Sequence, residues 1–117
     1  MKVIEKATIT KLNDNTFADK DDHVISIYLN YEDNSSQGTP GYRGNAYNSF
    51  ITNIMAILNV EEKNQILGKH VLACTDFNRL FALGNQLGNE WIDLRNPSEI
   101  IKGDIIQYFE KQEDLER

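Results

Sequence analysis

Residues 23–31, with the sequence HVISIYLNY, alternate between apolar and mostly polar side chains. This period of two is the pattern of a strand with one buried face. Residues 3–12 are rich in β-branched side chains and have a related pattern, with Val3, Ala7 and Ile9 on one face. The predicted inward positions of the second segment are Ile25, Ile27, Leu29 and Tyr31. We therefore expect the two segments to pair as strands of one sheet.

A change of period predicts a helix over residues 45–59. Its apolar positions recur at helical spacing and are Tyr47, Phe50, Ile51, Ile54, Met55 and Leu58. Three short apolar runs follow, at residues 69–75, 79–84 and 90–94, separated by turn-forming residues. They are typical of a three-stranded meander. The predicted fold class is α+β, with a largely antiparallel sheet of about five strands packed by one amphipathic helix.

A second helix is predicted near the C-terminus, over about residues 97–112. Asn96 suits an N-cap and Pro97 suits the first helical position. Ile101, Ile105, Tyr108 and Phe109 would share one face of this helix. Residues 113–117 would form a frayed, charged end. The chain contains no internal repeat and no linker-like segment, so we expect residues 1–117 to form one domain.

Composition excludes several classes of protein. The chain has one cysteine, Cys74, and no apolar run near the roughly 20 residues that span a bilayer. The N-terminal segment lacks the continuous apolar core of a signal peptide, so we expect a cytoplasmic protein without a membrane partner. The net charge of −6 opposes direct binding to nucleic acid, because phosphates would be repelled.

No catalytic motif is recognisable, and we expect neither an enzyme nor a cofactor. His23 and His70 are far apart in the sequence and lack metal-ligand spacing, so no metal site is predicted. Cys74 and His70 would lie too far apart on a strand to act as nucleophile and base, so Cys74 is interpreted as a core residue. The acidic segment 13–22 lacks the glycine and distal glutamate of an EF-hand and is interpreted as a solvated hairpin loop.

The glycine-rich segment 38–48, with the sequence GTPGYRGNAYN, is the strongest candidate for a binding site. Glycines allow a ligand to approach main-chain N–H groups, and the following helix has no acid in its first turn to occupy its positive end. An arginine offers a fork for phosphate, and two tyrosines offer stacking faces. The alternative is that this segment is only a strand-to-helix connection. The candidate ligand-binding residues are Gly38, Gly41, Tyr42, Arg43, Gly44, Asn45, Tyr47 and Asn48.

Several short motifs occur in a fixed order along residues 6–94. They include a Gln-Gly-x-x-Gly-Tyr turn at 37–42, the amphipathic helix, Leu-Gly-Lys-x-Val at 67–71, and Gly-x-x-Trp-x-Asp at 88–93. In this order the chain resembles a family of small phage and prophage proteins without assigned chemistry, although Thr39 and Pro40 stand where the family pattern is richer in glycine. The resemblance implies a phage-encoded accessory protein acting in the host cytoplasm and supplies no catalytic residue.

Two hypotheses of function follow from these observations. In the first, the protein is a non-enzymatic counter-defence factor that captures a small anionic, nucleotide-like signal at residues 38–48, with a pocket that a homo-oligomer would help to build. In the second, it is an acidic inhibitor that binds a host defence protein or nuclease directly, as anti-CRISPR proteins do. An accessory role in replication or morphogenesis is a third alternative.

Overall fold

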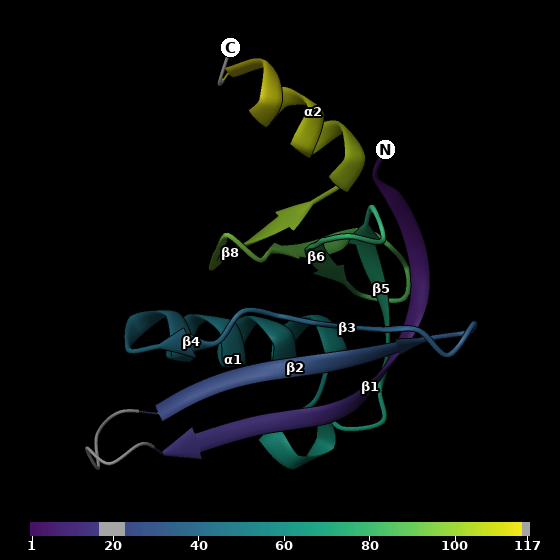
Figure 1. The fold of residues 1–117 in the computed structure, drawn as a ribbon. Coiled ribbons are helices and arrows are strands. Elements are labelled where there is room, and N and C mark those ends of the chain that lie inside the picture. Colours follow the sequence, from purple (N-terminus) through teal and green to yellow (C-terminus); the bar gives the residue numbers. More distant parts are fainter. Residues whose placement is uncertain (17–22, 116–117) are drawn as a thin grey trace.

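The computed structural model describes residues 1–16 and 23–115. The strands in this part of the chain are β1 (Val3–Thr16), β2 (His23–Tyr31), β3 (Ser36–Gly38), β4 (Tyr42–Arg43), β5 (His70–Thr75), β6 (Leu80–Gly84), β7 (Glu90–Asp93) and β8 (Asn96–Lys102). The helices are α1 (Asn45–Leu58), the short 3₁₀ helix η1 (Lys63–Gln65) and α2 (Ile105–Leu115). All strands belong to one antiparallel sheet in the order β3-β2-β1-β5-β6-β7-β8, with β4 also paired to β2 (Figure 1).

The predicted pairing of the first two strands is confirmed. Ala7 lies opposite Tyr31 and Ile9 opposite Leu29, so the alternate apolar side chains of both strands lie on the same face of the sheet. A bulge falls between Ile9 and Lys11. Beyond it β1 continues along β2, while its first residues pair with β5, so this one long strand joins the two halves of the sheet (Figure 1). The acidic positions Asp19, Asp21 and Asp22 lie outside the described residues.

The inner core lies between α1 and one face of the sheet. The helix contributes Phe50 and Ile54, as its apolar period predicts, and also Ile57, which was not among the predicted positions. The sheet contributes alternate residues from most of its strands, because alternate side chains point to the same face. The main strand residues of this inner core are Ala7, Ile9, Ile25, Ile27, Leu29, Val71, Ala73, Leu83 and Ile92.

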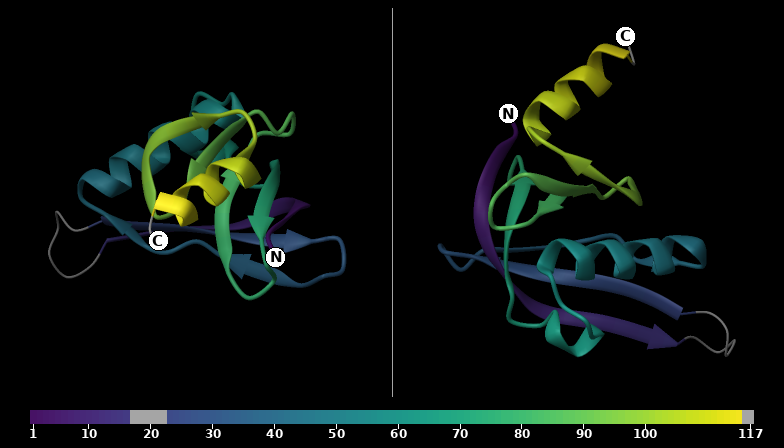
Figure 2. Two further views of the ribbon diagram at one scale, coloured as in Figure 1. Left: turned by 90° about the horizontal axis from the view of Figure 1, so that it is seen from above. Right: turned by 180° about the vertical axis from the view of Figure 1, so that it is seen from behind.

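A smaller outer core lies on the opposite face, under α2. On β5 the alternation is direct, because Ala73 belongs to the inner core while Cys74 belongs to the outer one. Trp91, Ile105 and Phe109 complete the centre of the outer core. The two helices therefore cover opposite faces of the sheet, and α2 lies apart from α1 (Figure 2). Cys74 is buried in this core, which confirms its interpretation as a core residue, and burial raises the pKa of its thiol to about 11.

The fold class is confirmed, but the sheet has eight strands in the described residues instead of about five. Two of the additional strands, β3 and β4, are only three and two residues long. β3 ends at the first residue of the glycine-rich segment 38–48, and β4 lies within that segment. Strands this short carry no readable alternation, so their pairing to β2 is set by the tertiary structure.

The predicted start of the C-terminal helix is wrong. Residues from Asn96 to Lys102 form the edge strand β8, in which Ile100 packs on the inner core and Ile101 on the outer core. Pro97 is compatible with this position because an edge strand tolerates a missing N–H. The helix begins after Gly103, which has φ of +102°, and the Asp104 carboxylate accepts a hydrogen bond from the Gln107 N–H at 3.2 Å.

Within residues 1–16 and 23–115, no helix combines the length and the apolar character that crossing a bilayer requires.

Candidate functional site

Four of the eight candidate residues lie together at the start of α1. Gly44, Asn45, Tyr47 and Asn48 line a hollow of about 410 Å³, which we call the α1-start hollow. Three residues from distant parts of the chain complete its lining. They are Asp14 near the end of β1, His23 at the start of β2 and Lys63 at the start of η1.

Gly44 determines how the chain enters this site. Its φ of 58° and ψ of −128° are accessible to glycine and strained for other residues, and the helix begins at the next residue. No side chain among the described residues caps this end of α1. The first turn also contains no acidic residue. The partial positive charge of the helix start is therefore left without a carboxylate from the helix itself.

Asp14 supplies a carboxylate from a neighbouring strand instead. Both of its oxygens lie 3.0 Å from the Tyr47 hydroxyl, which donates to them, and Lys63 forms an ion pair with one of them. Lys63 also donates to the Tyr47 hydroxyl at 3.1 Å. The His23 ring lies 6.0 Å from the Tyr47 ring, between centroids. The site therefore combines one acid, one base and two aromatic rings at a helix start.

The electrostatics of the Asp14 and Lys63 pair favour the charged forms. Burial raises the pKa of Asp14, but the hydrogen bonds from Lys63 and Tyr47 and the nearby positive charge outweigh it, and the pKa lies below its ordinary value. The hydrogen bond to Asp14 raises the pKa of Lys63. Since 44% of the Lys63 side chain is exposed, the ammonium can also be reached from solvent.

Tyr42 was predicted as a stacking face for a ligand, and the structure contradicts this prediction. Its side chain is buried, its ring packs 4.5 Å from that of Phe50 between centroids, and its hydroxyl donates to the Leu94 carbonyl at 2.6 Å. Burial raises the pKa of this phenol. The alternation of β4 points Tyr42 into the inner core, which two residues of sequence could not reveal.

Gly38 and Gly41 have packing roles and do not line the α1-start hollow. A Cβ at Gly38 would lie 2.8 Å from the Tyr28 ring, and a Cβ at Gly41 would lie 2.9 Å from a Val24 methyl group. These contacts favour the alternative interpretation for the two glycines, that they belong to a strand-to-helix connection and not to a ligand site. Arg43 is exposed on β4 opposite Val24 and also lies outside the hollow's lining.

Sequence reasoning missed Asp14 and Lys63 as site residues. Each is far in sequence from the helix start, and each sits in a polar segment where solvent exposure is the ordinary interpretation. An acid-free first turn was the available signal, since it leaves the positive end of the helix to charged groups from elsewhere in the fold or to a ligand.

In residues 1–16 and 23–115, no group of three or more histidine, cysteine, aspartate or glutamate side chains is placed to hold a metal ion. The Thr8 hydroxyl and His70 Nδ1 are 3.0 Å apart on the outer face of the sheet, whereas Cys74 is buried in the outer core. Comparison with known proteins adds no relative, because no family model, curated protein or solved structure matches the chain.

Proposed function

We propose that this protein is a non-enzymatic binder of a small anionic, nucleotide-like ligand, which it holds in the α1-start hollow. The observation that carries the proposal is that a helix start, capped by no side chain of the described residues, meets the Lys63 ammonium around one hollow. Main-chain N–H groups at a helix start bind phosphate oxygens well, and a lysine adds a charge-assisted contact. Gly44 has no side chain to obstruct that approach.

The two aromatic rings at the hollow suit the remainder of a nucleotide. Tyr47 and His23 both line it, and a base could pack against either ring. The Tyr47 hydroxyl already bonds to Asp14, which keeps this ring in place at the mouth of the site.

Asp14 would oppose the ligand in this proposal. An incoming phosphate and the Asp14 carboxylate would compete for Lys63, and the two anions would repel each other. The net charge of −6 also gives no long-range attraction for an anion. Affinity would therefore come from short-range contacts, and it would increase when Asp14 is made neutral.

The biological setting is part of the proposal and rests on the resemblance to small phage proteins. A non-enzymatic binder of nucleotide-like anions would act as a counter-defence factor by capturing a nucleotide immune signal in the host cytoplasm. Homo-oligomerisation would help such a protein to enclose its ligand.

Isothermal titration calorimetry tests the binding function. Cyclic dinucleotides, cyclic mononucleotides and ADP-ribose derivatives would be titrated into the wild-type protein and into Lys63→Ala. A matched control is Lys69→Ala, since Lys69 is exposed and does not line the hollow. We expect binding that weakens about tenfold in Lys63→Ala and is unchanged in Lys69→Ala. Absence of heat with every ligand would refute the proposal, and loss of binding in Arg43→Ala alone would move the site out of the hollow.

A second candidate function, inhibition of a host defence protein or nuclease, is favoured by a different surface. Phe77 exposes 58% of its surface at a hairpin tip, and its φ of 71° is strained for an aromatic residue. Asp76, Glu110 and Glu113 line a hollow of about 320 Å³ beside it, together with Lys2, which forms an ion pair with Glu113. The excess of acidic side chains there would suit a basic partner. Affinity capture of a nuclease by the wild-type protein, with loss in Phe77→Ser, would support this function, and equal capture by both would contradict it.

A further inference from the structure

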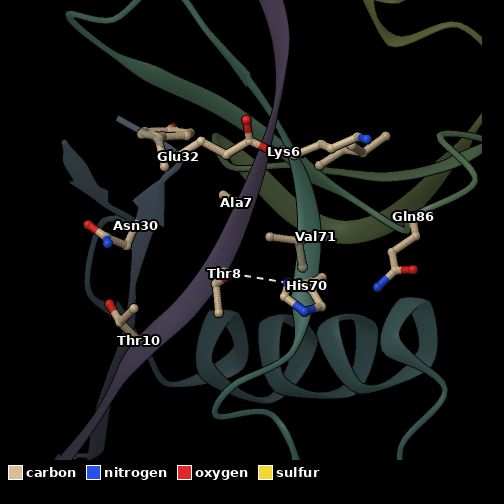
Figure 3. Close-up of a pocket in the computed structure, with 11 residues that line it drawn as sticks. Lys6, Ala7, Thr8, Thr10, Asn30, Glu32, His70, Val71 and Gln86 are labelled. Atoms are coloured by element: carbon tan, nitrogen blue, oxygen red, sulfur yellow. Dashed lines mark hydrogen bonds between the residues drawn. The ribbon is translucent and has the colours of Figure 1, made fainter. Parts of the chain in front are cut away.

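A larger hollow of about 710 Å³ lies on the outer face of the sheet, across β2, β1 and β5 (Figure 3). Its outward-facing lining residues alternate along their strands with residues of the inner core, of which Ala7, Tyr31 and Val71 also line the hollow. For example, Thr8 lies between Ala7 and Ile9, which are buried under α1. The side chains of α2 cover the outer face around Cys74 and Trp91, so they leave the region near Thr8 uncovered. We call this region the outer-face hollow.

Most polar groups in the outer-face hollow can both donate and accept hydrogen bonds. They come from two hydroxyls, two amides and one imidazole, on Thr8, Thr10, Asn30, Gln86 and His70. The Thr8 hydroxyl and His70 Nδ1 are 3.0 Å apart, which fixes the orientation of the imidazole (Figure 3). All but Gln86 are carried by strands, so the set is rigidly spaced.

The charges of this hollow offset each other. Lys6 and Glu32 are its charged residues, one of each sign, in a chain whose net charge is −6. A site of this kind neither attracts nor repels an ion strongly. It is therefore better matched to a neutral ligand that is rich in hydroxyl groups than to a phosphate or a carboxylate.

An exposed aromatic residue, Tyr28, lies on the same face of the sheet as the outer-face hollow. Tyr28 lies two residues before Asn30 on β2, which places both side chains on the same face. Its ring lies over Gly38, where a Cβ would come within 2.8 Å of it, and 41% of the residue is exposed. The Thr10 hydroxyl, which lines the hollow, lies 3.5 Å from the Tyr28 main-chain carbonyl, and the Lys11 ammonium lies 5.7 Å from the centre of the Tyr28 ring. Gly38 thereby lets an aromatic platform rest on the sheet.

We propose that the outer-face hollow binds a neutral oligosaccharide. Sugar hydroxyls are both donors and acceptors, as are most of the lining groups, and the C–H face of a sugar ring packs on an exposed aromatic ring such as Tyr28. The volume lies within the range of about 300–1,000 Å³ that is typical of small-molecule sites. This site lies on the opposite sheet face from the α1-start hollow and is independent of the function proposed there.

Backbone amide NMR of the ¹⁵N-labelled full-length protein tests this proposal. Maltotriose, cellotriose and chitotriose would each be added to about 10 mM, which detects millimolar binding. We expect at least one of them to shift the amides of residues 6–10, 28–32 and 70–72. Asn30→Ala and Tyr28→Ala should each lower the affinity for that saccharide about tenfold. Phe77→Ala is the control, since it removes an exposed aromatic residue elsewhere.

Each other outcome overturns the proposal. Absence of shifts with all three saccharides, shifts confined to other strands, or equal binding by all variants would do so. Inorganic phosphate provides a further arm. If phosphate shifts the amides of 28–32 and the saccharides do not, the hollow is an anion site. If phosphate shifts only residues 44–48 while a saccharide shifts residues 28–32, the two hollows are separate sites and the saccharide proposal is supported. Thermal melting of each variant confirms that it is folded.

Discussion

The Tyr47 hydroxyl lies 3.0 Å from both carboxylate oxygens of Asp14 and ties the first turn of α1 to the far end of β1. Lys63 joins the same group from η1 through its ion pair with Asp14. Residues of β1, α1 and η1 therefore converge at the start of one helix. This convergence makes the helix start both a structural junction and the site at which we propose an anion binds.

Replacing Asp14 separates these two roles. In Asp14→Asn the competing negative charge is lost while the shape of the side chain is kept, so we expect nucleotide-like ligands to bind several-fold more tightly. The free energy of unfolding should fall by less than about 1 kcal/mol, because the ion pair is partly exposed. Calorimetry and urea denaturation measure the two quantities. Weaker ligand binding in Asp14→Asn would show that the carboxylate assists the ligand instead of opposing it.

The lowered pKa of Asp14 predicts how its contribution depends on pH. A carboxyl whose folded pKa lies below its ordinary value of 3.8 stabilises the fold above that value, and the stabilisation is lost as the pH falls through the folded pKa. We therefore expect the stability difference between wild type and Asp14→Asn to be present at pH 7 and to shrink below pH 3.8. Urea denaturation of both proteins across this range measures it. A difference that grows as the pH falls would contradict the assignment.

The buried hydroxyl of Tyr42 has a structural role. It donates to the Leu94 carbonyl at 2.6 Å, so Tyr42→Phe should leave that carbonyl unsatisfied and reduce the free energy of unfolding by about 1–2 kcal/mol. Ligand affinity should not change, because Tyr42 lies in the inner core. Chemical denaturation and calorimetry on the same sample check both parts. An unchanged stability together with weaker ligand binding would restore Tyr42 as a site residue.

Gly84 is required by its cross-strand neighbour. It lies opposite Trp91, and a Cβ at this position would come within 2.5 Å of the indole ring. The ring is fully buried and its Nε1 donates to the Gly88 carbonyl at 2.9 Å, so it cannot move aside easily. Gly84→Ala should destabilise the protein by about 3 kcal/mol, whereas the exposed change Glu99→Ala on β8 should cost little. Similar midpoints of urea denaturation for the two variants would refute this.

The regular parts of the fold could be predicted because each buries a single face. β2 and α1 carry clear periods of two and of 3.6 residues, and both are found where the sequence places them. β8 could not be recognised, since Ile100 and Ile101 are neighbours that pack on opposite cores and so give no alternation of polarity. Asn96 suits an N-cap and Pro97 the first helical position, so local preference predicts a helix start there. Tertiary pairing of these residues' strand with β7 overrides that preference.

The site could be predicted only in part, for a related reason. Local sequence identifies a glycine followed by a helix without acids in its first turn, and Gly44, Asn45, Tyr47 and Asn48 do line one hollow. The partners of that helix start come from β1, β2 and η1, and their approach depends on the register of the whole sheet. Such contacts are set by topology, which no motif within residues 38–48 encodes.

Amide NMR at the start of α1 tests the central claim most directly. If a nucleotide-like anion binds the helix start, the backbone N–H signals of Asn45, Ala46 and Tyr47 should move downfield and saturate with the ligand, because these groups gain hydrogen bonds to phosphate. In Lys63→Ala, about ten times more ligand should be needed to reach half of the maximal shift. If a ligand binds by calorimetry while these three amides stay in place, or if no anion of the panel moves them, the proposed site is wrong.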